Sequence, residues 1–354
     1  MRRAKLLTII CIGELVFGWM AASAGAKVLE VPGQFNSISG ALEVAAPGDE
    51  VVVAPGTYPE DLILKSGVVL RSQGSNDERA KFISASRTVI QSAKVSPQIV
   101  LGAEGAVLDG FTLKEAQGRL TLPAGGYGVS INSAAMTVTN CIIASLPGNG
   151  VGIKGSTAKG ASIIRNNKIY NNQGNGIDCE EGAEAQIESC EIYLNAGSGI
   201  HNAYGARPSI KRNIIRQNGV DGVMNTDKAE PVIQENEIYQ NGLNGIGLQL
   251  SSKGKVVSNQ IKNNRQAGVG LRLNAECIIQ NNTISGNSIG IGLMDIRAAL
   301  IESNRITGNN MVGVGMIACR GGKVTLRNND LRGNRGLPMS PNFGCELIEE
   351  DNEM

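Results

Sequence analysis

A glycine followed by isoleucine or valine recurs through the middle of the chain, and this repeat limits the possible folds more than any other feature. The steps between these glycines are 22 to 24 residues. The series consists of Gly128, Gly152, Gly176, Gly199, Gly222, Gly245, Gly268, Gly290 and Gly313. Such a period is typical of a solenoid, in which each repeat forms one coil and stacks on the next.

Two series of asparagines keep the same period. The first comprises Asn167, Asn213, Asn236, Asn259, Asn282 and Asn304, with Cys190 in its place once. The second lies five residues later and comprises Asn172, Asn195, Asn218, Asn241, Asn264, Asn287 and Asn309. Stacked coils lie about 4.8 Å apart, so equal positions form columns in which side-chain amides can bond to one another. Asparagine also tolerates the positive φ of tight turns. We interpret both columns as structural and assign them no chemistry.

Between these marks the apolar residues alternate, as they do at Val269, Leu271 and Leu273. This is the period of a strand, and no segment within a repeat is long enough for a helix. The pattern predicts three short strands and three turns in each repeat. The predicted fold is therefore all-β, a single-stranded right-handed parallel β-helix of roughly nine to eleven coils with an N-terminal cap.

The two ends of the chain depart from the repeat. The basic start and the apolar run of residues 1–26 predict a signal peptide, which we expect to be cleaved near Ala26. Residues 27–71 predict an N-terminal cap and the first strands, including a short helix over 36–46. Residues 72–335 predict the coils, with an excursion over 114–126, and residues 336–354 an irregular acidic tail. We expect the processed chain in the periplasm or outside the cell, without a membrane span.

Charge and cysteine content exclude several classes of function. The chain has 33 Lys and Arg against 32 Asp and Glu, so no basic excess points to nucleic acid. Six cysteines remain after the predicted cleavage and none forms a Cys-x-x-Cys motif. We expect at most one or two disulfides, or buried free thiols, and no metal site.

The segment over residues 45–58, AAPGDEVVVAPGTY, followed by Glu60, resembles the opening of exported proteins of the pectin-lyase-fold superfamily. The repeats are similar to those of its NosD-type and carbohydrate-binding or sugar-hydrolase groups. The resemblance implies the right-handed β-helix and a polysaccharide partner. It implies no single activity, because members include lyases, hydrolases, epimerases, adhesins and proteins with no known reaction.

The motifs of particular enzymes in the superfamily are missing. Asn225-Thr226-Asp227 matches one element of polygalacturonases, but their other three elements are absent. The Asp-Pro-His motif of mannuronan epimerases and the acidic nonapeptide repeats that bind calcium are absent too. Calcium remains open as a cofactor without a motif to support it, so the cofactor is unknown.

One outward column of the repeats carries groups suited to acid–base chemistry. The second residue after each glycine mark reads Ser130, Lys154, Asp178, His201 and Met224, followed by Gly247, Gly270, Gly292 and Gly315. His201 is the only histidine of the chain. We expect Lys154, Asp178 and His201 side by side, with Glu180 adjacent. As catalytic residues, Lys154 would neutralise a sugar carboxylate, His201 would act as a base and Asp178 would orient it. The alternative is a salt-bridge cluster on a solvated sheet.

A second column, on a different face, is suited to carbohydrate binding. It lies three residues after the first asparagine series and consists of Tyr170, Tyr193, Arg216, Tyr239 and Lys262. Tyrosine rings can stack on pyranose faces and the cations can hold anionic groups. The alternative is an exposed ladder, because tyrosine and arginine pack well across strands.

These observations support three hypotheses of function. The first is an exported β-helix protein that engages a polysaccharide along its long face, with lyase or epimerase activity on uronic-acid glycans. The second is a non-enzymatic surface, adhesion or scaffold protein, and the third is a periplasmic metal-handling accessory protein like the NosD type. The sequence leaves open whether the chain is an enzyme. A groove over His201 with converging ionisable groups would favour the first, and a flat glycine-lined face the second.

Overall fold

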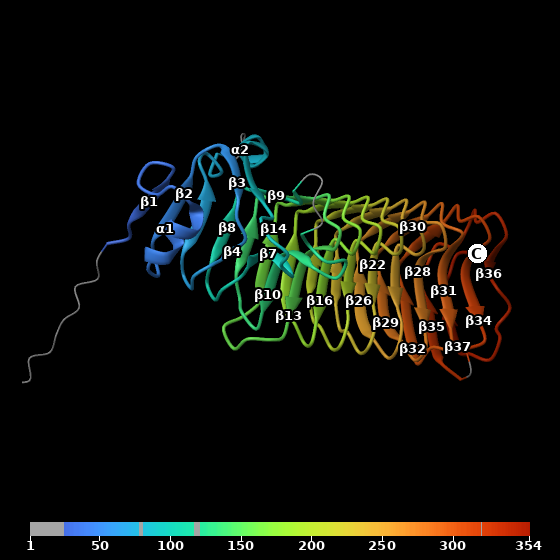
Figure 1. Ribbon diagram of the computed structural model, residues 1–354. Coiled ribbons are helices and arrows are strands. Elements are labelled where there is room, and N and C mark those ends of the chain that lie inside the picture. The colour runs from blue at the N-terminus through green and yellow to red at the C-terminus, as the bar shows by residue number, and fades with distance from the viewer. Residues whose placement is uncertain (1–24, 78–80, 117–120, 320) are drawn as a thin grey trace, which may run out of the picture.

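The computed structural model describes residues 25–77, 81–116, 121–319 and 321–354, so most of the predicted signal peptide lies outside the described residues. Within these ranges the chain forms one elongated parallel β-solenoid (Figure 1). Its strands form three sheets of 14, 12 and 11 strands. Each strand pairs in parallel with the equivalent strand of the neighbouring coil. The described helices include none long and apolar enough to cross a membrane.

The three sheets run the length of the solenoid. Sheet A contains β1 (Val28–Val31), β2 (Glu50–Val53), β5 (Val69–Ser72), β8 (Val107–Asp109), β11 (Thr137–Thr139), β14 (Ser162–Arg165), β17 (Ala185–Glu188), β20 (Ser209–Lys211), β23 (Val232–Gln234), β26 (Lys253–Val257), β29 (Glu276–Gln280), β32 (Ala298–Glu302), β35 (Lys323–Arg327) and β37 (Glu346–Glu350). Sheet B contains β3 (Gly56–Pro59), β6 (Thr88–Gln91), β9 (Thr112–Lys114), β12 (Ile142–Ala144), β15 (Lys168–Tyr170), β18 (Glu191–Tyr193), β21 (Ile214–Arg216), β24 (Glu237–Tyr239), β27 (Gln260–Lys262), β30 (Thr283–Ser285) and β33 (Arg305–Thr307). Sheet C contains β4 (Leu62–Ile63), β7 (Gln98–Leu101), β10 (Tyr127–Asn132), β13 (Asn149–Lys154), β16 (Ile177–Glu180), β19 (Ile200–Asn202), β22 (Val223–Asn225), β25 (Ile246–Leu248), β28 (Ala267–Arg272), β31 (Ile289–Met294), β34 (Val312–Ile317) and β36 (Leu337–Met339).

Both asparagine columns form hydrogen-bonded ladders in the interior. In the first, the side-chain amide of Asn213 donates to Asn236 Oδ1 at 3.0 Å, and the backbone N–H of Asn213 donates to the same oxygen at 2.9 Å. The second repeats this arrangement, for example from Asn195 to Asn218 Oδ1 at 3.0 Å. The positive φ belongs instead to the residue before each ladder asparagine, such as Arg212 and Gln217. Our expectation that the asparagines themselves adopt it was wrong, because their side chains must point inward to stack.

The helix predicted over 36–46 forms α1 (Ile38–Val44), which packs on β1, β2 and β4 at the N-terminal end. Ser37 caps it by accepting a hydrogen bond from Gly40 N at 3.0 Å. The carboxylate of Glu60 also accepts from Ile38 N and Ser39 N, at 2.9 and 2.8 Å. Glu60 therefore joins the cap to the first coil, since carboxylates satisfy free N–H groups at a helix start. A second helix, α2 (Lys81–Arg87), flanks sheet B.

Two expectations about coil number and the C-terminus were wrong. Sheet A has 14 strands, whereas we expected roughly nine to eleven coils. The residues after 336 are not an irregular tail, because Leu337–Met339 pairs with β34 and Glu346–Glu350 pairs with β35. Backbone pairing extends the N-terminal end without the glycine and asparagine marks, whereas Asn329, Asn334 and Asn352 continue the two ladders at the C-terminal end. The acidic side chains of β37 lie on an edge strand, where charge discourages pairing with another chain.

Cys319 and Cys345 form a disulfide that ties this last coil to the previous one. Cys141, Cys179, Cys190 and Cys277 are free and buried. Desolvation by burial raises the pKa of Cys141 and of Cys190 to about 12, so these thiols are not nucleophiles at neutral pH.

We expect the double substitution Cys319→Ser and Cys345→Ser to destabilise the C-terminal coil by about 3 kcal/mol, because the bond closes a 26-residue loop. Coils interact mainly with their neighbours, so the loss should stay local. Hydrogen exchange should accelerate in β36 and β37 and remain unchanged in β19 and β22. Equal exchange in the parent and the variant would show that the disulfide adds nothing to this end.

Candidate functional site

The ionisable residues predicted from the outward column gather on sheet C, but in two adjacent rows. Asp178 pairs with His201 on the next coil and with Gly152 on the previous one. Lys154 instead pairs with Glu180, two residues further along the same strands. Our placement of Lys154 directly beside Asp178 was therefore wrong by one row.

The error has a local cause. Residues 149–153 contain two glycine marks, Gly150-Val151 and Gly152-Ile153, and the first of them is the one in register with Gly176-Ile177. Sequence spacing favoured the second because it keeps a 24-residue step. The actual coil is longer by the turn over residues 155–161, which the even spacing concealed.

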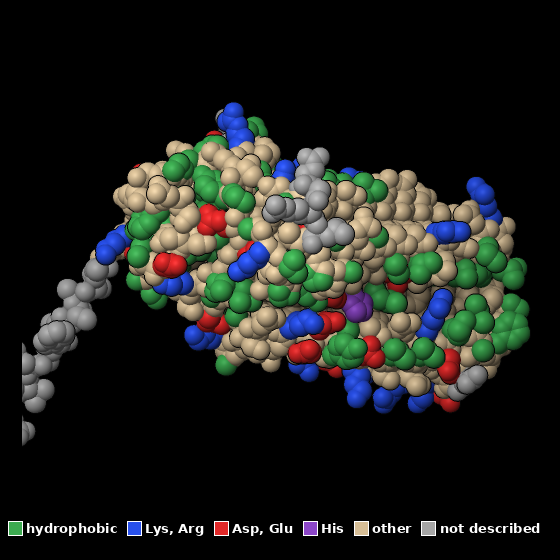
Figure 2. Space-filling view, viewed as in Figure 1, with side chains coloured by type: hydrophobic (Ala, Val, Ile, Leu, Met, Phe, Trp, Pro, Cys, Tyr) green, Lys and Arg blue, Asp and Glu red, His purple; other side chains and the backbone are tan. Residues whose placement is uncertain are grey.

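The two rows form two short ionic contacts. His201 Nδ1 lies 2.7 Å from Asp178 Oδ1, and Lys154 Nζ lies 2.8 Å from Glu180 Oε2. Asp178 is buried, while His201 is partly exposed. Figure 2 shows the histidine in purple on the long face, with acidic and basic side chains beside it. Because Nδ1 contacts the carboxylate, we assign its proton to Nδ1, which leaves the lone pair on Nε2.

The surroundings of His201 act on its pKa in opposite directions. Desolvation alone would lower the pKa of the imidazole. The hydrogen bond that the imidazole donates to Asp178 and the negative charges of Asp178, Glu180 and Asp227 outweigh this, so the pKa of His201 is raised above the ordinary value of 6.5. The contact with Asp178 therefore favours the protonated imidazole.

Tyr127 joins this cluster, and the sequence reasoning missed it. Its ring lies over Gly152, where any Cβ would collide with it. Lys154 Nζ lies 5.8 Å from the ring centroid. Burial, followed by the charge of Asp178, raises the pKa of the phenol, so it stays protonated at neutral pH. The one signal in the sequence was the glycine at 152, in a row where neighbouring coils carry Asp178 and His201.

The family described as "Right handed beta helix region" matches residues 127–271 and 208–353, which together span more than half of the chain. The chain belongs to this right-handed β-helix family. Among curated proteins, none matches the sequence.

Solved structures of low sequence identity share the fold of this β-helix protein. The Azotobacter vinelandii mannuronan C-5 epimerase AlgE6 A-module superposes with a TM-score of 0.71 at 18% identity, covering 89% of this chain and 93% of that one. A variant of the periplasmic alginate epimerase AlgG gives 0.66 at 13% identity, covering 93% and 84%. The catalytic unit of an α-1,3-glucanase from Streptomyces thermodiastaticus gives 0.60 at 14% identity, covering 94% and 69%. The pectin-lyase-like fold expected from the sequence is confirmed.

Asp178, Glu180 and His201 could in principle share a cation, because one ligand atom of each lies within 4.8 Å of the others. Calcium prefers six to eight oxygen ligands, and this β-helix protein offers two carboxylates and an imidazole nitrogen there. The ammonium of Lys154 already contacts Glu180 at 2.8 Å. The cluster therefore does not fit calcium, and we derive no step through a metal.

The predicted tyrosine column is in register along sheet B. The rings of Tyr170 and Tyr193 stack with centroids 4.8 Å apart, and the guanidinium of Arg216 covers Tyr193 at 4.3 Å. Lys262 lies 5.3 Å from the centroid of Tyr239. Tyr193 thus meets neighbours from both adjacent coils, whereas Tyr170 and Tyr239 each have one ring face against a neighbour. The role of this column in binding carbohydrate stays a prediction.

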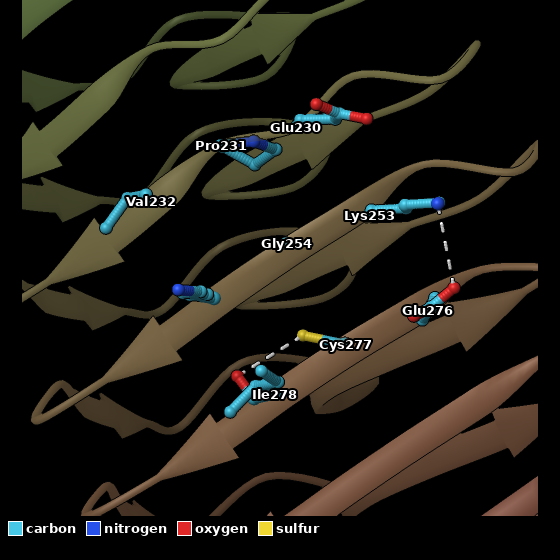
Figure 3. Close-up of a pocket in the computed structure, with 9 residues that line it drawn as sticks. Glu230, Pro231, Val232, Lys253, Gly254, Glu276, Cys277 and Ile278 are labelled. Atoms are coloured by element: carbon cyan, nitrogen blue, oxygen red, sulfur yellow. Dashed lines mark hydrogen bonds and ion pairs between the residues drawn. The ribbon is translucent and has the colours of Figure 1, made fainter.

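A cavity of about 340 Å³ lies on sheet A (Figure 3). Several of the polar groups that line it have partners. Lys253 Nζ lies 3.9 Å from Glu276 Oε2, and the thiol of Cys277 lies 3.6 Å from the carbonyl oxygen of Ile278. Desolvation raises the pKa of the Cys277 thiol, so it is not a nucleophile. This cavity offers no group for catalysis comparable with the His201 cluster.

Proposed function

We propose that this β-helix protein binds an acidic polysaccharide along sheet C and removes the C5 proton of a uronic acid residue at His201. The observation that carries the proposal is the 2.7 Å contact between His201 and Asp178, with Lys154 in the adjoining row and the ring of Tyr127 over Gly152. A base, an orienting carboxylate, a cation and a neutral phenol are the groups that this reaction needs.

The step conserves atoms and electrons. His201 Nε2 takes the proton from C5, and the electron pair of the C–H bond moves into the sugar carboxylate, whose charge Lys154 neutralises. Asp178 stabilises the imidazolium that forms. In epimerisation, Tyr127 then returns a proton to C5. In lyase cleavage, Tyr127 instead protonates the leaving O4 as a C4–C5 double bond forms.

The comparisons support the substrate class. Two of the superposed proteins are named as alginate or mannuronan epimerases and the third as a glucanase, so each is named for action on a polysaccharide. One of them is named as periplasmic. We propose the same kind of location, in the periplasm or outside the cell, with the signal peptide removed near Ala26.

The test is an assay of the purified protein against a panel of polyuronates and neutral glycans. It records binding, the ultraviolet absorbance of unsaturated ends, and exchange of C5 hydrogen with deuterated water. Absorbance identifies a lyase, and exchange without absorbance an epimerase. Binding without either would assign a non-enzymatic carbohydrate module. No binding to any polyuronate would contradict the proposal and favour the scaffold hypothesis.

The pH dependence of kcat/KM should report the raised pKa of His201. Because the base must be neutral, the rate should rise through a pKa above 6.5 and then level off, since the pKa of Tyr127 is raised as well. Asp178→Asn removes the interaction that raises the pKa of His201, so the acidic limb should move to lower pH. An acidic limb at the same pH in both proteins would show that Asp178 does not tune the base.

A further inference from the structure

The outward row that carries Asp178 and His201 continues into a line of glycines. Beyond His201 the row reads Met224, Gly247, Gly270, Gly292 and Gly315. Two cavities lie over this line, of about 240 and 120 Å³, and they share Asn244, Gln266, Gly270 and Arg272. The glycine-lined part of sheet C is therefore hollowed rather than flat, and we call it the glycine trough.

The side chains on the two sides of the trough, which we call its banks, differ in chemistry. One bank consists of Arg272 and, on the next two coils, Met294 and Ile317, which are 39% and 46% exposed. Within the described residues no ion pair holds Arg272. The other bank consists of the polar side chains of Asp221, Asn244 and Gln266. Exposed apolar groups with a few polar side chains are typical of a ligand site.

Asp221 is an unusual member of this bank because it is a buried carboxyl with a spare oxygen. Its Oδ1 accepts from the backbone N–H of Asn244 at 2.7 Å and from the side-chain amide at 3.1 Å. Its Oδ2 has no hydrogen-bond partner among the described residues. Oδ2 faces Gly247, where a Cβ would collide with it, and lies beside Met224. Desolvation raises the pKa of Asp221 to about 6.

The turn that leads into β22 does not itself require a carboxyl at position 221. On a preceding coil an amide holds the equivalent turn: Asn175 Oδ1 accepts a hydrogen bond from Ser198 N at 2.8 Å. An asparagine at 221 would accept the same bonds without the cost of a buried acid. A buried polar atom without a partner calls for an explanation, and a ligand hydroxyl in the trough supplies one.

We propose that the glycine trough holds the part of the polysaccharide that extends beyond the sugar at His201, with Arg272 binding a uronate carboxylate and Asp221 Oδ2 accepting a hydroxyl once Met224 turns aside. This inference rests on the proposed function and specifies its substrate as a long chain. Gly270 lies three coils from His201, about 14 Å at the spacing of adjacent strands. A short oligomer bound at His201 therefore does not reach Arg272.

The test uses two variants of the full chain and one control. Gly292→Val fills the trough, and it fits because an added Cβ meets only Ala267 Cβ at 3.7 Å and Ile289 Cγ2 at 3.9 Å. Arg272→Gln removes the cation. Thr325→Val places the same valine on the outer face of β35 in sheet A. Circular dichroism and thermal unfolding establish that each variant is folded.

Calorimetry then measures the Kd of a polyuronate, of a uronate disaccharide and of a neutral polymer. We expect both trough variants to weaken polyuronate binding about tenfold or more, since a charge-assisted contact contributes roughly 1.5–3 kcal/mol. Disaccharide binding and turnover, and all properties of Thr325→Val, should stay within about twofold of the parent.

The outcomes separate this inference from the proposed function. If the parent processes polyuronate and both trough variants bind it as the parent does, the trough inference is overturned and the proposed function stands. If the parent binds polyuronate without turnover and the variants bind it weakly, the trough is supported and the catalytic role of His201 fails. If the parent binds no polyuronate, both are overturned.

Discussion

His201→Gln is expected to lower the rate of C5 proton transfer by roughly 10²- to 10⁴-fold, the contribution of a positioned general base. Glutamine can still donate to Asp178, so the sheet and the binding surface should remain intact. The Kd for polyuronate should therefore stay within about threefold of the parent. Single-turnover exchange of C5 hydrogen and calorimetric binding measure the two quantities.

Two further measurements separate catalysis from structure. Lys255→Gln, which changes an exposed cation on sheet A, should leave both rate and affinity unchanged. His201→Ala opens a space beside Asp178, and added imidazole should restore part of the lost rate. A purely structural role would show no rescue. An unchanged rate in His201→Gln would remove this residue from the mechanism.

The fold could be predicted because a solenoid repeats the same physical requirements in every coil. Ladder asparagines such as Asn213 and Asn236 recur because each satisfies buried groups of the neighbouring coil, and turn glycines such as Gly245 recur because a side chain would collide there. At Gly245, for instance, a Cβ would lie 2.7 Å from Gly268 O. The first coil was underestimated because Val28–Val31 joins sheet A through backbone bonds and carries no ladder asparagine. The last coil was missed because Asn329 follows Asn304 after a step of 25 residues, which departs from the regular repeat, although Asn329 and Asn352 continue the ladder.

The site was predictable where coil length is constant and not where it changes. Asp178 and His201 are 23 residues apart, the regular step, and they pair as expected. Lys154 was misplaced because the turn before the next coil is longer. Tyr127 lies at the start of a strand, outside the strict alternation on which the prediction depended. Its position over Gly152 depends on the conformation of the chain around it.

The glycine trough could not be predicted from the sequence, for a different reason. A line of glycines suggests a flat surface, since nothing in their own positions indicates depth. Depth comes from the neighbours, such as Arg272 on one bank and Asn244 on the other. Asp221 lies outside the outward column, at the turn that leads into the strand. Sequence columns place residues along one row, whereas a cleft is formed between rows.

Asn241→Ala should have the largest effect on stability of any single change considered, with a loss of about 3–5 kcal/mol. Asn241 Oδ1 accepts from the backbone and the side chain of Asn218, both at 3.1 Å. Its amide donates to Ile215 O at 3.3 Å and to Asn264 Oδ1 at 3.0 Å. Alanine leaves these buried groups without partners, and each buried group left unpaired costs about 1–3 kcal/mol. Urea denaturation followed by circular dichroism measures the loss.

The matched control is Asn310→Ala, which makes the same change at an exposed turn position and should cost less than about 0.5 kcal/mol. The cooperativity of unfolding should change as well. Because each coil contacts only its neighbours, a break in the middle of the ladder should divide one cooperative unit into two. Hydrogen exchange in Asn241→Ala should then show β22 and β25 opening before β10 and β34. A uniform loss across all coils would mean that the ladder stabilises the solenoid as a whole, and a loss no larger than that of Asn310→Ala would mean that the asparagines are dispensable.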